Sequence, residues 1–126
     1  MRASFGLPIL LFGLAAGCEP SPGHPPIARI TISPRAIPAH DGFRTELVLD
    51  GTTSADPIDD PDGANPLGYE WKIVGDEVRM AKGDDRSEKI TVRFLGERPA
   101  TVFLTVSDDT GLFTTARMQV QLTVMP

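Results

Sequence analysis

The chain has 126 residues, with 12 lysines and arginines against 17 aspartates and glutamates, and a formal net charge of -5 at pH 7. This length predicts a single domain. The acidic balance argues against nucleic acid as a partner, because phosphate binding needs a surplus of cationic side chains. Apolar residues make up 40% of the chain, which is enough for a core and argues against wholesale disorder. The 12 glycines and 12 prolines disfavour a helical bundle.

Residues 1–17 have the features of a secretory signal. Arg2 gives a basic start, and residues 5–16 form an apolar run that is shorter than the roughly 20 residues a membrane-spanning helix needs. Residues 14–18 have the sequence LAAGC, which resembles the lipobox of bacterial lipoproteins. The resemblance implies cleavage before Cys18 and acylation of its sulfur. The alternative is an ordinary signal peptide followed by a free thiol.

Residues 18–26 are predicted to form a lipidated cysteine and a Pro-rich tether. The segment EPSPGHPP at 19–26 is held extended by its prolines and predicts a semi-rigid connection. Because Cys18 is the sole cysteine, no internal disulfide can form, and a lipidated Cys18 leaves the folded part without a thiol, which suits an oxidising compartment. We therefore expect a protein of the bacterial cell envelope, anchored to a membrane through its N-terminal lipid and facing the periplasm or the cell surface.

From Ile27 onward, apolar residues alternate with polar residues, which is the period of a half-buried strand. Trp71 occupies the inward face of its strand and is predicted to be a central core residue. The turn DDTG at 108–111 predicts a hairpin between the last two strands. Short strands bounded by Gly, Pro, Asp and Asn predict an all-β, immunoglobulin-like antiparallel β-sandwich. About seven strands are expected, around residues 28–33, 46–49, 67–73, 78–81, 90–94, 101–106 and 114–124.

Three blocks of the sequence resemble, in the right order, the PKD (polycystic kidney disease repeat) family. They are VLDGTTSADP at 48–57, PLGYEW at 66–71 and TVFLTVSDDTG at 101–111. The sequence departs from the family where it has WKIVGD in place of WDFGDG, and at Ala100, where the family has a tyrosine. The resemblance implies a PKD-type sandwich at 27–126, outside the cytoplasm. Members of this family mostly act as spacers, adhesion modules or accessories that contact proteins or carbohydrates.

Acidic residues cluster between Asp50 and Asn65, and a further acidic pair follows at 108–109. Calcium takes about six to eight oxygen ligands, so the first loop is a candidate calcium site. The calcium-loop template D-x-D-x-D-G is incomplete, because Ile58 stands at its first position. The alternative is that these residues only shape turns by accepting backbone N–H groups. The candidate ligands are Asp56, Asp59, Asp60, Asp62 and Asn65.

Residues suited to catalysis do not form a recognised pattern. His40 and Asp41 are sequence neighbours, and neighbours on an extended chain point to opposite faces. The sequence has no G-x-S-x-G elbow and no phosphate loop, and ligands at zinc spacing are missing. We therefore expect a protein that is not an enzyme and needs no cofactor, calcium being the alternative. A His–carboxylate pair within hydrogen-bond reach in a cleft would favour an enzyme instead.

Phe103, Phe113 and Met125 are out of phase with the core positions of their strands. If they face solvent as neighbours, they form an apolar patch suited to contact with a partner. The alternative is that a loop or a bulge covers them. The function we expect is a non-catalytic binding or structural role toward an envelope protein or a glycan. A calcium-dependent module is the second hypothesis, and an enzyme is a distant third.

The anchor can be tested by intact mass spectrometry of the full-length protein purified from bacterial membranes. We expect a mature chain that begins at Cys18 and carries acyl mass, because two or more acyl chains give stable membrane anchoring. An unmodified, released chain would contradict the anchor and would leave Cys18 as a free thiol.

Overall fold

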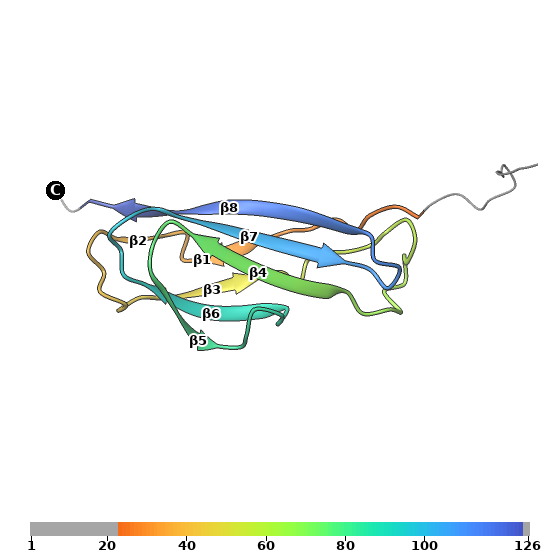
Figure 1. Ribbon diagram of the computed structural model, residues 1–126, viewed down its shortest axis with the longest axis horizontal. Helices are drawn as coiled ribbons and strands as arrows, with labels where there is room; N and C mark the ends of the chain where they lie inside the picture. The colour runs from red at the N-terminus through yellow and green to blue at the C-terminus, as the bar shows by residue number, and fades with distance from the viewer. Residues whose placement is uncertain (1–22, 125–126) are drawn as a thin grey trace, which may run out of the picture.

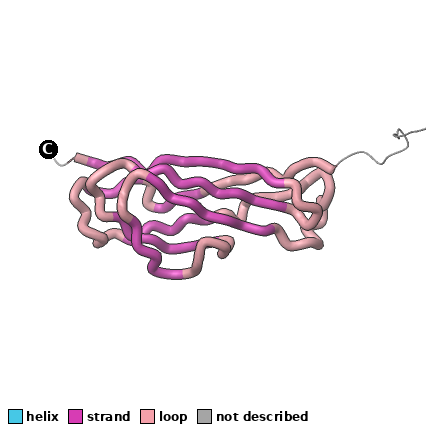
Figure 2. Tube along the Cα trace, in the orientation of Figure 1, coloured by secondary structure: helices cyan, strands magenta, loops and turns pink. Residues whose placement is uncertain are grey.

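The computed structural model describes residues 23–124, which form a β-sandwich of two four-stranded sheets (Figure 1). One sheet has the order β1-β3-β6-β5 and the other the order β2-β8-β7-β4. Strands run along the long axis, and loops gather at the two ends (Figure 2). The strands are β1 (Thr31–Ser33), β2 (Ala36–Pro38), β3 (Glu46–Asp50), β4 (Gly68–Val74), β5 (Val78–Lys82), β6 (Lys89–Phe94), β7 (Ala100–Ser107) and β8 (Phe113–Thr123). In this part of the chain, no helix is long and apolar enough to cross a membrane.

The core lies between the two sheets, because strand alternation directs every second side chain inward. Trp71 is 5% exposed, and its indole N–H donates to the carbonyl oxygen of Ser87 at 2.7 Å. The predicted core position of Trp71 is therefore confirmed. Aliphatic side chains supply most of the remaining core, which consists of Ile30, Ile32, Ile37, Leu47, Leu49, Trp71, Ile90, Val92, Phe94, Ala100, Val102, Leu104, Val106 and Val120.

Strand β7 is paired on both sides. It pairs with β8 as an antiparallel hairpin from Ala100↔Val120 to Ser107↔Phe113, which confirms the predicted hairpin. It pairs with β4 from Gly68↔Ser107 onward. The start of β4 and the end of β7 therefore lie side by side. As a result, the loop that precedes β4 and the turn that follows β7 emerge at the same end of the sandwich.

Two features differ from the expected fold. The described residues form eight strands rather than about seven, because Ala36–Pro38 forms β2. The sandwich is also not wholly antiparallel, since β2 pairs with β8 in parallel, with Ile37 opposite Leu122. Three residues are too few to display an alternation, and a proline within a short run argues against a strand unless the strand lies at an edge. Strand β2 is such an edge strand.

Gly51 ends the run LDG and allows β3 to approach the opposite sheet. A Cβ at this position would lie 2.7 Å from Cδ2 of Leu104 and 3.3 Å from the carbonyl oxygen of Glu88. We therefore expect Gly51→Ala to lower the free energy of unfolding by about 1–3 kcal/mol, the usual cost of overpacking a core. Urea denaturation measures this change. Thr53→Ala, exposed in the same loop, is the control, and a Gly51→Ala variant as stable as that control would contradict the prediction.

Candidate cation site

Two loops at one end of the sandwich bring three carboxylates together. Asp56 and Asp59 lie between β3 and β4, and Asp108 lies between β7 and β8. One carboxylate oxygen of each lies within 4.8 Å of the other two. Two oxygens that bind one calcium ion at ~2.4 Å are at most ~4.8 Å apart, so the spacing suits a single ion. In Figure 1, these loops lie at the end of the sandwich where the described chain begins.

Asp56 is buried, with 7% of its surface exposed. Its backbone carbonyl accepts the N–H of Asp60 at 2.8 Å, which fixes the local turn. Its Oδ1 atom is buried and has no hydrogen-bond donor among the described residues. A buried polar atom without a partner is costly, and such atoms normally have a donor, a water molecule or an ion. Asp56 therefore combines an unpartnered buried oxygen with membership of the carboxylate cluster.

The surroundings of Asp56 disfavour its charged form. Burial raises the pKa of the Asp56 carboxyl above its ordinary value, and the negative charges of Asp59, Asp108 and Asp60 raise it further. The backbone N–H of Asp59 opposes these effects without reversing them. A divalent cation among these groups would favour the charged form of each carboxylate. The ionised carboxylates thus repel one another when no cation lies among them, and a bound cation would offset this repulsion.

Asp108 is favoured in its charged form by its own turn. Its Oδ1 atom accepts hydrogen bonds from the Thr110 N–H at 2.9 Å, the Thr110 hydroxyl at 2.7 Å and the Leu112 N–H at 3.0 Å. The Thr110 hydroxyl is the main cause of a lowered pKa of Asp108, with burial opposing it and the backbone donors adding to it. The turn between β7 and β8 therefore presents an ionised carboxylate to the cluster.

Asp59 joins the cluster to the segment that precedes the first strand. The backbone N–H of His24 donates to Oδ2 of Asp59, and the ring Nδ1 of His24 lies 3.4 Å from Oδ1. A Cβ on Gly23 would lie 2.9 Å from Oδ2 of Asp59 and 3.1 Å from Cδ1 of Leu112. The backbone at Gly23 therefore lies against both loops that supply carboxylates.

The same segment is also fastened to the sandwich beside Asp56. Ile27 donates to the carbonyl oxygen of Ala55 at 2.6 Å and accepts the N–H of Ala55 at 3.0 Å. Pro26 is fully buried. Gly23, the first described residue, thus already contacts the sandwich, four residues before the expected start of the domain at 27. Part of the predicted tether belongs structurally to the domain.

The other residues predicted as ligands lie outside the cluster of three carboxylates. The Asp60 carboxylate accepts the N–H of Ala64 at 3.1 Å and the N–H of Asn65 at 2.9 Å, which is the turn-shaping role that the sequence left open. Asp62 and Asn65 are exposed in the same loop. The five-residue prediction and the cluster therefore share Asp56 and Asp59. Asp108 was noted in the sequence as part of another acidic loop, but the contact between the loops depends on strand pairing.

An open hollow leads from solvent to Asp56. Its volume is about 350 Å³, and its lining includes Asp56, Asp60, Asn65, Tyr69 and Glu88. Apolar side chains, among them Pro57, Pro61, Pro66 and Leu67, share the lining with these polar ones, and the hollow gives Asp56 access to solvent.

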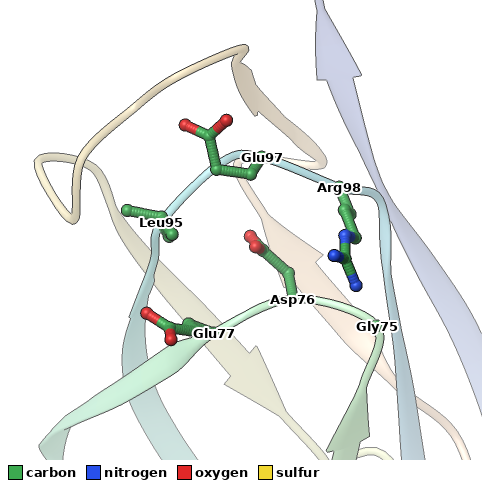
Figure 3. A pocket seen from close by; sticks show the side chains of 6 residues that line it. All are labelled: Gly75, Asp76, Glu77, Leu95, Glu97 and Arg98. Atoms are coloured by element: carbon green, nitrogen blue, oxygen red, sulfur yellow. The ribbon is translucent and has the colours of Figure 1, made fainter.

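A second hollow lies at the opposite end of the sandwich, where β4 leads into β5 (Figure 3). Its volume is about 450 Å³. Two of its three carboxylates are engaged, since Asp76 accepts the N–H of Gly96 at 2.8 Å and Glu97 lies 2.9 Å from Nδ1 of His40. The lining residues are Gly75, Asp76, Glu77, Leu95, Glu97 and Arg98.

The pair formed by His40 and Glu97 is the kind of arrangement that would favour an enzyme. Both side chains are exposed, by 79% and 45% respectively. Glu97 lines the hollow and His40 does not, and the lining contains no serine, threonine or cysteine. The neighbouring Asp41 is occupied by the N–H groups of Arg44 and Thr45. These contacts describe an exposed hydrogen bond between a histidine ring and a carboxylate at the surface of the sandwich.

Phe103 and Phe113 lie on the outer face of the β2-β8-β7-β4 sheet but are not side by side. The opposed pair Thr105 and Thr115, whose hydroxyls are 2.9 Å apart, lies between them. Phe113 is 63% exposed, and Phe103 is half-buried. Met125 lies outside the described residues. The described part of this face is therefore polar between two separated aromatic rings.

Comparison with known proteins supports the fold alone. No protein-family model matches the chain, and no curated protein matches it. Among solved structures, the chain is similar to a nucleoside hydrolase-related hypothetical protein from Saccharophagus degradans that is associated with carbohydrate metabolism. The TM-score is 0.57 at 16% sequence identity. The match covers 80% of this chain and 26% of that chain, so the similarity concerns one part of a longer protein.

The charge on Asp56 gives a stability prediction in the absence of divalent cations. Because the pKa of Asp56 is raised in the folded state, its ionised form destabilises the folded protein at pH values above that pKa. We expect Asp56→Asn to raise the thermal midpoint by a few degrees in EDTA at pH 7, measured by scanning calorimetry. Asp109→Asn removes an exposed charge next to the cluster and is expected to leave the midpoint unchanged. A lower midpoint for Asp56→Asn would contradict this account of the cluster.

Proposed function

We propose that this chain is a lipid-anchored, non-catalytic module of the bacterial cell envelope whose PKD-type, immunoglobulin-like domain binds calcium. The ligands are Asp56, Asp59 and Asp108. The observation that carries calcium binding is the Asp56 side chain, which belongs to a cluster of three carboxylates and whose buried Oδ1 atom has no donor among the described residues. Calcium suits such a site because it accepts flexible oxygen coordination, whereas magnesium demands near-ideal octahedral geometry and gives up water reluctantly.

The order of the strands supports the immunoglobulin-like assignment. The orders β1-β3-β6-β5 and β8-β7-β4 correspond to the A-B-E-D and G-F-C sheets of a constant-type immunoglobulin domain, with β2 added at the edge beside β8. The three sequence blocks similar to the PKD family cover the end of β3 with its loop, the start of β4, and β7 with its turn. They therefore meet at the end of the sandwich that carries the carboxylates.

The lipobox-like sequence supports the anchor and sets its distance from the site. Gly23 lies five positions after Cys18, and five residues span at most ~18 Å. The carboxylate end of the sandwich is thus the end nearest to the membrane. The opposite end and the sheet faces are directed toward the envelope, where a protein or a glycan is the partner. Phe103 on the outer face, with Lys72 and Arg117 opposite it on the neighbouring strands, offers such a partner an aromatic ring between two cations.

Calcium is expected to stabilise the chain by mass action. For a dissociation constant of ~10⁻⁴–10⁻³ M, as in weak extracellular calcium sites, about 10 mM calcium adds about 1.4–2.7 kcal/mol to the free energy of unfolding. This corresponds to a rise of roughly 5–15 °C in the thermal midpoint of a domain of this size. Scanning calorimetry in EDTA and in calcium measures it, with magnesium at equal ionic strength as the control for screening.

Matched variants locate the site. Asp56→Asn and Asp108→Asn are expected to lose the calcium response, whereas Asp62→Asn, which removes a charge from the same loop outside the cluster, is expected to keep it. If Asp62→Asn loses the response and Asp108→Asn keeps it, the calcium ion belongs to the single loop that the sequence indicates. An unchanged midpoint of the native chain at millimolar calcium would overturn the site altogether.

A further inference from the structure

The cation site and the stalk, defined here as residues 23–27, share Asp59. We infer that calcium bound by Asp56, Asp59 and Asp108 fixes Gly23 and His24 against the sandwich, so that the cation sets how rigidly the domain is joined to its anchor. This inference rests on the calcium site proposed above. It goes beyond that site because it assigns the ion a role in stiffening the connection between the domain and its membrane anchor.

The two halves of the stalk are held in different ways. At its end nearest the sandwich, Pro26 is fully buried and Ile27 exchanges two backbone hydrogen bonds with Ala55. These contacts involve no carboxylate. At the end nearest the anchor, Gly23 and His24 are exposed, and the hydrogen bonds found for His24 go to Asp59. Only this outer half therefore depends on the position of a ligand carboxylate.

The outer half touches both loops that form the site. The Gly23 backbone lies against Asp59 of one loop and the Leu112 side chain of the other. Leu112 in turn donates its N–H to Asp108 at 3.0 Å. The stalk therefore docks where the two loops meet, and its docking requires the loops to stay together.

The negative charges of the three carboxylates link the docking of the stalk to the binding of a cation. Without a cation, three carboxylates share a space in which one oxygen of each lies within 4.8 Å of the other two, and Asp59 lies in an exposed part of its loop. The mutual repulsion of like charges therefore acts on the residue that is least held by packing. Displacement of Asp59 removes the acceptor of the His24 N–H. A calcium ion attracts all three carboxylates and keeps Asp59 in place, and a carboxylate has enough lone pairs to bind an ion and an N–H donor together. Because linkage is reciprocal, a docked stalk also raises the affinity for calcium.

Hydrogen exchange at single amides tests the inference directly. The full-length chain, made by cell-free synthesis and kept in detergent micelles, is compared by NMR in EDTA and in about 10 mM calcium. The His24 amide is expected to exchange at least about tenfold more slowly with calcium. The matched control is the Gly96 amide, which also donates to an aspartate, Asp76, at 2.8 Å but at the opposite end. Exchange of the Gly96 amide by local opening does not involve the cation and is expected to keep its rate, whereas exchange through global unfolding slows only by the stabilisation of the whole fold.

Two variants separate the docking of the stalk from the binding of calcium. His24→Pro removes the N–H donor and extends the proline pair at 25–26. By reciprocity it is expected to weaken calcium binding by about two- to tenfold in titration calorimetry. Asp56→Asn removes a ligand without touching the acceptor of His24, and the His24 amide of this variant is expected to show no response to calcium.

The outcomes distinguish the inference from the site on which it rests. Calcium binding in calorimetry with an unchanged His24 exchange rate overturns the inference and leaves the calcium site standing. Equal slowing of the His24 and Gly96 amides also overturns it, because calcium would then stabilise the whole fold without a specific effect on the stalk. No calcium binding by the native chain overturns both the site and the joint.

Discussion

The pairing of β7 with both β4 and β8 decides which loops share an end of the sandwich. Val102, Leu104 and Val106 of β7 are fully buried, and a slip of one residue would turn all three to the surface. The core therefore enforces the register in which Gly68 lies opposite Ser107. This register brings the loop of Asp56 to the turn of Asp108. The carboxylate cluster is thus a consequence of burying apolar side chains elsewhere in the same strands.

Asp56 differs from the other well-positioned aspartates of the fold. Burial opposes ionisation of Asp41, but the hydrogen bonds from Thr45 and Arg44 outweigh it and lower its pKa. A hydrogen bond from the Thr52 hydroxyl is the main cause of the lowered pKa of Asp50. These side chains stabilise turns by accepting local donors, and that role accounts for them fully.

For Asp56 the same explanation does not hold. Its Oδ1 atom lacks a donor among the described residues, and its pKa is raised. The contrast is informative because the turns of this chain repeatedly supply N–H and hydroxyl donors to aspartates, as Thr110 does for Asp108. A buried carboxylate oxygen that receives no such donor, on a side chain beside two other acids, is the observation on which the proposed cation site rests. A cation is the partner that its surroundings favour.

The sequence was sufficient to predict the sandwich but only part of the site. Alternation identifies the inward side chains of the long strands, and it places Trp71 in the core. It does not reveal β2, whose three residues are too few to show a period. Clustering along the chain pointed to Asp56 and Asp59. It also included Asp60, because composition cannot distinguish a ligand from a residue that accepts the N–H groups of its own turn.

Local sequence patterns could not predict the contacts between segments that lie far apart in the chain. Asp108 lies about fifty residues from Asp56, and only the register of β4 with β7 brings the two together. The stalk is a similar case. Its prolines predicted an extended connection, which is a statement about local stiffness. The docking of His24 on Asp59 depends on the position of a loop thirty-five residues away.

A joint of this kind suits a chain with one cysteine. Such a chain cannot fasten its stalk to the domain with a disulfide, so the stiffness of the connection must come from prolines, packing and charge. Pro26 and the Ile27–Ala55 bridge hold the inner half permanently. The outer half is held through carboxylates that contribute nothing to the apolar core. The proposed cation would therefore act on this half while the sandwich keeps its fold, because the carboxylates that would bind it and the side chains that form the apolar core are different residues.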